Sequence, residues 1–402
     1  MQAFDYDIVV SGGGIAGLIT TAAFGQNGFS VLCVDPTPPA TSAKATGADM
    51  RTTAILQPGQ RMLEAAGLWA SLAPHAAALE TMRIIDAGGK DPNARIIKDF
   101  RSSDVSDLPF GWNLPNWLLR REMVARLKDI PSVTFQPGVS TTNYLGRTSS
   151  ARVKLSSGQT VKTRLVIAAD GRESPMRKAA GIDVTTRRYG QKALAFAVTH
   201  TVPHENVSTE IHRTGGPFTL VPLPDRDGMP ASAVVWMDDA NACLRRFELP
   251  QDAFEAEISE RSCHIFGPLT LATQRSIWPI ISQHAREFTA TRLALIAEAA
   301  HVVPPIGAQG LNMSLTDTAS LLSLSQNDPA DLGTQQMLDA YEKARAKDIR
   351  LRVSGIDLLN RVSQFKTPAL RDARAAGLNA LYAATPVRKM LMQMGLGLRD
   401  QG

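Results

Sequence analysis

The chain is poor in cysteine and has no long apolar run. Its three cysteines, Cys33, Cys243 and Cys263, form no CxxC pair, which excludes a disulfide scaffold. No stretch approaches the ~18 consecutive apolar residues that a membrane-spanning helix needs. No secretory leader is recognisable before a strand that begins near Asp7. For a complete chain these absences predict a reducing compartment, with a bacterial cytoplasm as the simplest location.

Most of the chain also lacks an excess of charge of either sign. The net charge of the 402 residues is +5, but residues 341–402 contain twelve basic and five acidic residues. This tail therefore carries +7 and the preceding 340 residues carry −2. The basic pI of about 9.2 is no argument for nucleic-acid binding, because it originates in the tail. We expect a near-neutral body, a basic C-terminal region and no nucleic-acid partner.

Metal-ligand clusters, internal repeats and low-complexity linkers are absent from the sequence pattern as well. His200 and His204 have the i, i+4 spacing of a helical metal site, but Pro203 and a strand-like context deny them a shared helical face. We therefore predict no metal. Hydrophobic residues make up 44% and charged residues 20%, which is typical of a globular protein of two or three domains.

The N-terminus has the pattern of a nucleotide-binding unit. A β-branched run leads into Gly12, Gly14 and Gly17, a helix is expected over 15–27, and a second strand ends at Asp35. Such glycines permit a tight turn and close approach of a pyrophosphate to the helix N-terminus, while an acid about 20 residues on binds ribose hydroxyls. This unit alone fits NAD, NADP and FAD equally well.

Two later segments resemble the flavin monooxygenases of the para-hydroxybenzoate hydroxylase type. Asp170-Gly171, followed by Ser174 and Arg177, is similar to the Asp-Gly motif of that family. Residues 295–312, with His301 and the Gly307-Ala-Gln-Gly310-Leu-Asn sequence, resemble the segment that contacts the flavin. The resemblance implies an α/β fold: a Rossmann-like FAD-binding domain, an inserted, mostly antiparallel β-sheet substrate domain, and here a helical C-terminal region.

The resemblance also implies which residues bind FAD. The cofactor-binding candidates are Gly12, Gly14, Ile15, Ala16, Gly17, Asp35, Arg51, Arg120, Val139, Asp170, Gly171, Glu298, Gly307, Gly310, Leu311 and Asn312. One departure is Ala297-Glu298, where the family has Gly-Asp. Glutamate keeps the carboxylate, so we expect Glu298 to bind a ribityl hydroxyl with a shifted backbone. His301 is a candidate base, although a hydrogen-bonded structural histidine is the favoured interpretation.

Within that family the chain is similar to the ubiquinone-biosynthesis hydroxylases. The similarity includes Asp49-Met-Arg51, Arg120 with the apolar residues after it, Tyr189-Gly-Gln191 and Asp357-Leu-Leu-Asn360. It implies hydroxylation of the ring of a polyprenylated phenol, in which NAD(P)H reduces FAD and O2 yields a flavin C4a-hydroperoxide. Two other hypotheses stay open: a hydroxylase of another small or hydrophobic phenol, and a non-catalytic flavoprotein subunit of a quinone-biosynthesis complex.

The pattern of elements predicts a discontinuous organisation. We expect the FAD-binding domain in 1–75, 98–185 and 282–340, the substrate domain in 76–97 and 186–281, and helices in 341–402. Helices are expected over 57–72, 117–130 and 311–324, with strands within 132–169 and 191–237 and a buried strand over 292–297. Candidate substrate-lining residues are Phe218, Leu220, Pro222 and Trp236, although core packing is the better interpretation of any single one.

The basic C-terminal region allows two interpretations. Thr385-Pro386 is expected to start a helix with Val387, Met390, Leu391 and Met394 on one face and basic residues on the other. Such a helix lies either on the inner face of the cytoplasmic membrane or against the core. The first interpretation adds peripheral membrane contact, or contact with lipid-carrying accessory proteins, to a cytoplasmic location.

Overall fold

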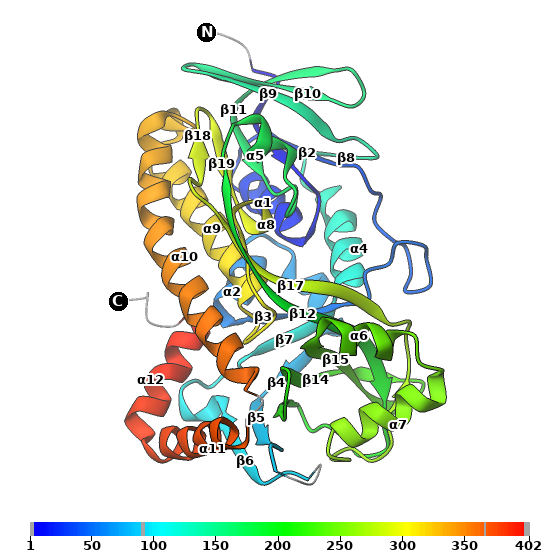
Figure 1. Cartoon of the computed structure of the whole chain (residues 1–402). Helices are drawn as coiled ribbons and strands as arrows, with labels where there is room; N and C mark the ends of the chain where they lie inside the picture. The colour runs from blue at the N-terminus through cyan, green and yellow to red at the C-terminus, as the bar shows by residue number, and fades with distance from the viewer. Residues whose placement is uncertain (1–3, 90–92, 366, 398–402) are drawn as a thin grey trace.

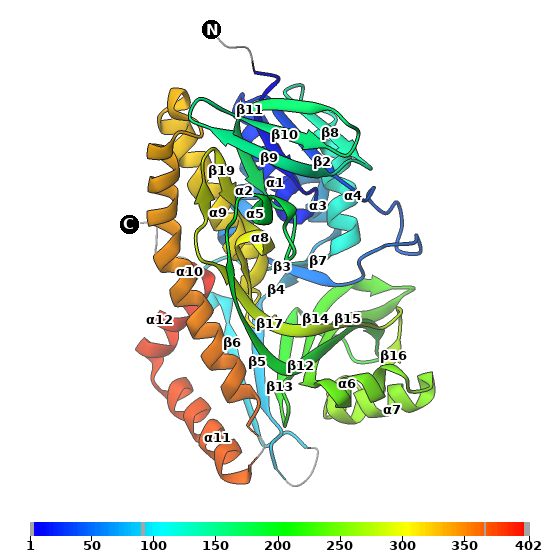
Figure 2. The same cartoon turned by 45° about the horizontal axis from the view of Figure 1, so that its top comes forward.

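The computed structural model describes residues 4–89, 93–365 and 367–397, and it has the mixed α/β architecture expected from the sequence. Its body consists of two large sheets joined by the long strands β12 and β17, with one long helix, α10, running beside both (Figures 1 and 2). The helical C-terminal region is confirmed: α10 is followed by α11 and α12 at the lower end of the second sheet.

The first sheet is Rossmann-like. Its order is β18-β19-β11-β1-β2-β8, and β1, β2, β8, β11 and β19 pair in parallel, while β10 and β9 continue from β11 as an antiparallel hairpin. Its strands are β1 (Tyr6–Ser11), β2 (Val31–Asp35), β8 (Val133–Pro137), β9 (Thr141–Arg147), β10 (Ser150–Leu155), β11 (Thr160–Ala168), β18 (Thr289–Ala290) and β19 (Leu293–Leu295). The parallel strands β1, β2, β11 and β19 bury consecutive residues on both faces, as is typical of such sheets, whereas the edge strand β8 is only partly buried.

The second sheet has the order β20-β17-β12-β15-β14-β13-β5-β6, with β16 on β12, and it is antiparallel except between β13 and β5. Its strands are β5 (Thr81–Asp86), β6 (Ile96–Arg101), β12 (Val184–Thr199), β13 (Val207–His212), β14 (Pro217–Arg226), β15 (Met229–Asp239), β16 (Thr270–Leu271), β17 (Ser276–Ala285) and β20 (His301–Val302). A small sheet, β3 (Thr52–Leu56), β7 (Gly111–Pro115) and β4 (Ala77–Leu79), lies beside it. The predicted division into domains stays a prediction. The second sheet crosses its bounds, because β6 and β17 extend beyond 97 and 281, β12 starts at Val184 and β20 lies wholly within 282–340.

The helices surround these sheets. They are α1 (Ile15–Gln26), α2 (Gln57–Ala65), α3 (Trp69–Leu72), α4 (Asn116–Leu127), α5 (Pro175–Ala179), α6 (Ala240–Phe247), α7 (Gln251–Arg261), α8 (Ala297–Ala300), α9 (Gln309–Asn327), α10 (Gln335–Ser363), α11 (Pro368–Ala383) and α12 (Thr385–Leu396), with 3-10 turns at 73–75, 102–104 and 329–331. Helix α1 packs on α2, α4 and α9 within the main core. Helices α6 and α7 cover the far face of the second sheet.

Two expected elements are wrong in their bounds. The helix expected over 57–72 is two helices, because Gly67 adopts a φ of +70° and the N–H of Leu68 turns back to the carbonyl of Leu63. The strand expected over 292–297 is only the three residues of β19. Arg292 and Ala297 have φ values of +62° and +55°, so neither can continue the strand.

Candidate active site

The glycine loop between β1 and α1 forms a tight turn that depends on two of its glycines. A Cβ at Gly17 would overlap the carbonyl oxygen of Gly12, and one at Gly12, whose φ is +102°, would overlap that of Ala169. Only glycine fits either position. Gly14 differs, because a Cβ there would meet no atom within 4 Å. No side chain caps α1, so its first N–H groups, at Ile15 and beyond, face this open space.

Asp35 and Arg120 hold the glycine loop in place through hydrogen bonds to Gly13 and to each other. Asp35 Oδ2 accepts a hydrogen bond from the Gly13 N–H at 2.7 Å, and its Oδ1 accepts one from Arg120 Nη2 at 3.1 Å. Arg120 Nε also donates to the Gly13 carbonyl at 2.9 Å, and the Val139 N–H donates to the Asp35 carbonyl at 3.2 Å. The structure thus brings together four predicted segments that are up to 126 residues apart in the sequence.

Asp170 lies against the same loop and holds an unpartnered acceptor. Its Oδ2 accepts hydrogen bonds from the Met176 N–H at 3.0 Å and from Ser11 Oγ at 3.3 Å, while its buried Oδ1 has no partner among the described residues. Burial raises the pKa of Asp170. Oδ1 is therefore the oxygen of this carboxylate that can accept a further hydrogen bond, and the hydroxyl groups of FAD are donors of the required kind.

Arg51 and Glu298 lie within electrostatic range of each other. Asp49 binds the Arg51 guanidinium through both carboxylate oxygens, at 2.8 and 2.7 Å, and the guanidinium lies 5.5 Å from the ring centroid of Trp278. The hydrogen bonds that Arg51 donates to Asp49, and more weakly the charge of Glu298, raise the pKa of Arg51. Glu298 is exposed at the start of α8. The two predicted residues are thus electrostatic neighbours although 247 positions separate them.

The segment from Gly307 to Asn312 shapes the start of α9. Gly307 and Ala308 have φ values of +64° and +56°, and no side chain caps the helix. Asn312 donates to the carbonyls of Ala54 at 3.0 Å and Ala308 at 2.7 Å, and its Oδ1 accepts from the Leu56 N–H at 3.0 Å. The Asn312 side chain therefore fastens α9 to β3. Gly310 is exposed and Leu311 packs against the main core.

A buried ion cluster beneath α8 escaped the sequence-based prediction. Asp317 is 0% exposed and accepts hydrogen bonds from His301 Nε2 at 2.7 Å, Arg345 Nε at 2.9 Å and the Ala297 N–H at 3.2 Å. His301 is therefore a hydrogen-bonded buried residue, in keeping with the favoured structural interpretation. One sequence feature could have indicated this cluster: Asp317 shares a helix face with the apolar residues Met313 and Leu321, where an acid is unusual.

The candidate substrate-lining side chains lie elsewhere. Phe218, Leu220 and Trp236 belong to a second core in which the sheet packs on Cys243, Phe254 and Ile258 of α6 and α7. Pro222 is buried on the same strand face, and its carbonyl accepts a hydrogen bond from Asn113 at 2.9 Å. The structure thus places these four on the face away from the glycine loop. Across the described residues, no group of three or more His, Cys, Asp or Glu side chains could hold a metal ion.

Comparison with known proteins bears on this geometry. The model of the FAD binding domain family matches residues 5–353. The chain belongs to this family. This flavoprotein is an FAD-dependent monooxygenase, and NAD(P)H and O2 are the co-substrates typical of its class. The predicted family and cofactor are confirmed, whereas the individual ligands to FAD stay predictions.

The flavoprotein resembles quinone-pathway enzymes along its whole length. It is 30% identical to the ubiquinone hydroxylase UbiL of Rhodospirillum rubrum over 98% of this chain and 90% of that protein. It is 24% identical to the 3-demethoxyubiquinol 3-hydroxylase of Escherichia coli over 98% of both. Among solved structures, p-nitrophenol 4-monooxygenase PnpA from Pseudomonas putida has a TM-score of 0.79 at 18% identity, covering 97% of this chain and 98% of that one. That structural similarity shows the fold.

Proposed function

We propose that this flavoprotein hydroxylates the aromatic ring of a polyprenylated phenol in ubiquinone biosynthesis. The observation that carries the proposal is the 30% identity to a ubiquinone hydroxylase over 98% of the chain. The geometry supports it, because the glycine loop contacts both the acid at the end of β2 and Asp170, which holds an unpartnered acceptor.

Each residue group has a distinct task in this proposal. The glycine loop and the N-terminus of α1 bind the pyrophosphate of FAD, Asp35 accepts hydrogen bonds from a ribose, and Asp170 Oδ1 accepts one from another hydroxyl. Glu298 takes the ribityl position and Arg51 borders the ring. Bound FAD supplies the redox chemistry that activates O2. The protein contributes orientation of the ring and exclusion of water.

The substrate ring belongs on the face of the second sheet that turns toward the first. Thr219 and Val221 of β14, with Val235 and Met237 of β15, occupy that face, because they alternate with Phe218 and Trp236. Met237 is part of the main core and Val235 packs against it, whereas Phe218 and Trp236 belong to the other core. A small apolar surface of this kind suits a phenol.

We further propose that the C-terminal helices contact an anionic membrane surface. Exposed apolar side chains follow one stripe of α10, at Leu351, Leu358 and Leu359, and one stripe of α12, at Val387, Leu391 and Met394. The same region carries the net charge of +7. Apolar stripes flanked by cations are the pattern of helices that lie in a lipid interface. In the part of the chain that the structure describes, no helix has both the length and the apolar character to cross a bilayer.

The experiment uses purified holoprotein. Bound FAD is measured by absorbance, and oxidation of NADH or NADPH is followed with a short-chain prenylated phenol, with small hydrophilic phenols and without substrate. Complementation of strains that each lack one ring hydroxylase of the quinone pathway identifies the position. Stimulation by the prenylated phenol with rescue of one strain is the expected result. Stimulation by hydrophilic phenols alone would refute the proposed substrate, and protein that never takes up FAD would refute enzymatic function.

A further inference from the structure

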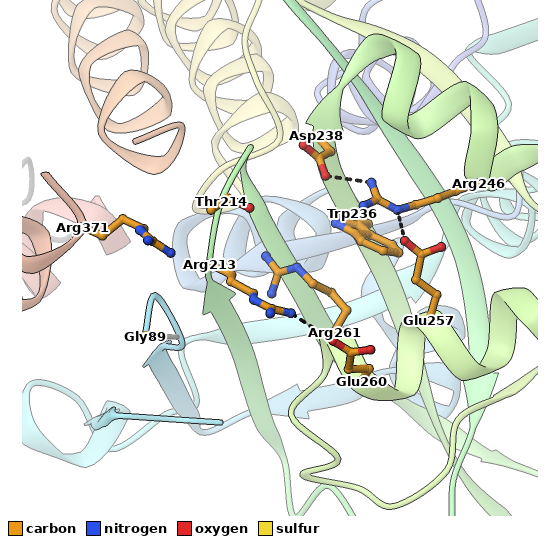
Figure 3. A pocket seen from close by; sticks show the side chains of 10 residues that line it. All are labelled: Gly89, Arg213, Thr214, Trp236, Asp238, Arg246, Glu257, Glu260, Arg261 and Arg371. Carbon is orange, nitrogen blue, oxygen red and sulfur yellow. Dashed lines mark hydrogen bonds and ion pairs between the residues drawn. The ribbon is translucent and has the colours of Figure 1, made fainter. Parts of the chain in front are cut away.

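A cavity lies on the side of the second sheet that faces away from the glycine loop. Its volume is about 430 Å³, and ten residues from β15, α6, α7, α11 and two loops line it (Figure 3). Four of the ten are arginines, namely Arg213, Arg246, Arg261 and Arg371. No step of the proposed hydroxylation uses them.

Two of these arginines are already neutralised. Arg246 Nη1 and Nε bind Asp238 and Glu257, each at 2.7 Å, and Arg213 binds Glu260 at 3.2 Å. All three acids that line the cavity therefore form ion pairs with Arg246 or Arg213. The remaining two, Arg261 and Arg371, form no salt bridge among the described residues, and Figure 3 shows their guanidinium groups directed into the same space from α7 and α11.

Arg261 is the decisive residue. It is only 6% exposed, its Nη2 donates to the carbonyls of Ile211 at 3.0 Å and Gly216 at 3.1 Å, and its Nη1 is buried without a partner. Burial lowers the pKa of Arg261 to about 10, so the group is still a cation at neutral pH. Burying a cation without an anion carries a large desolvation free energy, and pairing the cation with an anion offsets much of it.

Other orphaned groups in the same wall are donors too. Trp236, which is 1% exposed, has an unpartnered indole Nε1–H, and Arg371 has an unpartnered buried Nε–H. Together with Arg261 Nη1 this makes three buried donors around one cavity, while no acceptor of its lining side chains is left buried and unpaired in the described residues. Such a wall is complementary to a ligand that brings several acceptor oxygens and negative charge.

We propose that this cavity binds a phosphate group, carried either by a soluble phosphate ester or by a phospholipid headgroup. Guanidinium groups bind phosphate oxygens through paired hydrogen bonds, and donors converge on this cavity from α7, α11 and β15. The volume leaves room for more than the phosphate alone. This proposal does not depend on the proposed hydroxylation, because it concerns another face of the sheet.

The test measures binding to the FAD-loaded protein, in which FAD fills the pyrophosphate position of the glycine loop. The probes are inorganic pyrophosphate, followed by calorimetry, and vesicles of phosphatidylcholine with or without phosphatidylglycerol, followed by sedimentation. Arg261→Met keeps the apolar stem of the buried side chain, and Arg371→Gln removes the second cation from α11. Arg245→Gln is the matched control, because Arg245 is exposed on α6 beside Arg246 but does not line the cavity.

Saturable pyrophosphate binding that weakens at least tenfold in both cavity variants, and less than twofold in the control, would support a soluble ligand. Vesicle binding that both cavity variants reduce equally, without pyrophosphate binding, would support a headgroup. The proposal is overturned if neither probe binds, or if the variants bind both probes as the wild type does. Arg371→Gln keeps the test decisive if Arg261→Met fails to fold, because Arg371 is only half-buried on a helix surface.

Discussion

The buried carboxylate of Asp317 is the group whose removal we expect to disturb the cofactor site most, although it lies outside the sequence motifs. It fixes three segments at once: His301 after α8, Arg345 of α10, and the backbone N–H of Ala297, where the chain turns with a φ of +55°. Asp317→Asn preserves the volume but removes the charge. Arg345, buried in the same core, then keeps only its 2.7 Å ion pair with the partly exposed Asp348.

The magnitude follows from these contacts. Removing one partner from a buried ion pair costs about 3–5 kcal/mol. For a chain of 402 residues, with an unfolding entropy of about 2.1 cal/mol/K per residue, this corresponds to a Tm lowered by about 4–6 °C. Because Glu298 follows Ala297 directly, the loosened turn should also weaken FAD binding by roughly tenfold, which is 1.4 kcal/mol.

The assay separates the two effects. Thermal unfolding of the FAD-free protein reports stability, and quenching of flavin fluorescence during titration reports FAD affinity. The matched control is Asp339→Asn, which removes an exposed carboxylate from α10. A Tm within 1 °C of wild type together with unchanged FAD affinity would refute the reasoning. A lower Tm with unchanged affinity would confine Asp317 to a purely structural role.

Three further predictions rest on single residues. Gly14→Ala should leave the Tm of the FAD-free protein within about 1 °C of wild type, since its Cβ meets open space, yet weaken FAD binding at least tenfold. Gly17→Ala should lower both the Tm and the FAD affinity, because its Cβ overlaps Gly12. Calorimetry measures the Tm, and flavin titration measures the affinity. Ala297→Gly relieves a positive φ but adds unfolded-state entropy, so denaturant unfolding should find it within about 1 kcal/mol of wild type. Burial lowers the pKa of His200 below 6.5, so its contribution to stability is fully present above pH 6.5 and is lost as the pH falls from 6.5 through the lowered pKa. The Tm measured from pH 7.5 to 5 should therefore fall less steeply in His200→Gln.

The glycine loop was predictable because its chemistry depends on the backbone. Only glycine can occupy Gly12 and Gly17, so the sequence itself records the close approach of β1, α1 and β11. The acid at Asp35 is equally visible, since it ends a buried strand at a fixed distance from the loop. Arg120 was placed through family resemblance, and its contacts to Gly13 and Asp35 explain why an arginine serves there.

The ion cluster at Asp317 was not predictable in the same way. Its hydrogen bonds join residues 16, 20 and 28 positions away, and none of these spacings is a local pattern. The turn at Ala297 has the same origin. The family resemblance indicates that Ala297 replaces a glycine. Only the structure shows that Ala297 has a positive φ and that its N–H donates to the carboxylate of Asp317.

Strand β14 shows most clearly where periodicity fails to predict which side chains face which partner. In β14 the residues Phe218 and Leu220 alternate with Thr219 and Val221, so apolar side chains occur on both faces. A strand with one solvent-exposed face would have polar residues at every second position, and that alternation would show which face is buried. Here α6 and α7 cover one face and the cofactor-binding half of the molecule covers the other, so burial selects apolar residues on both. The large aromatic residues Phe218 and Trp236 lie on the face that packs on α6 and α7, and the opposite face carries smaller side chains such as Thr219, Val221 and Val235. Side-chain size therefore distinguishes the two faces of this sheet better than hydrophobicity does, because both faces are apolar and only one of them carries large aromatic residues.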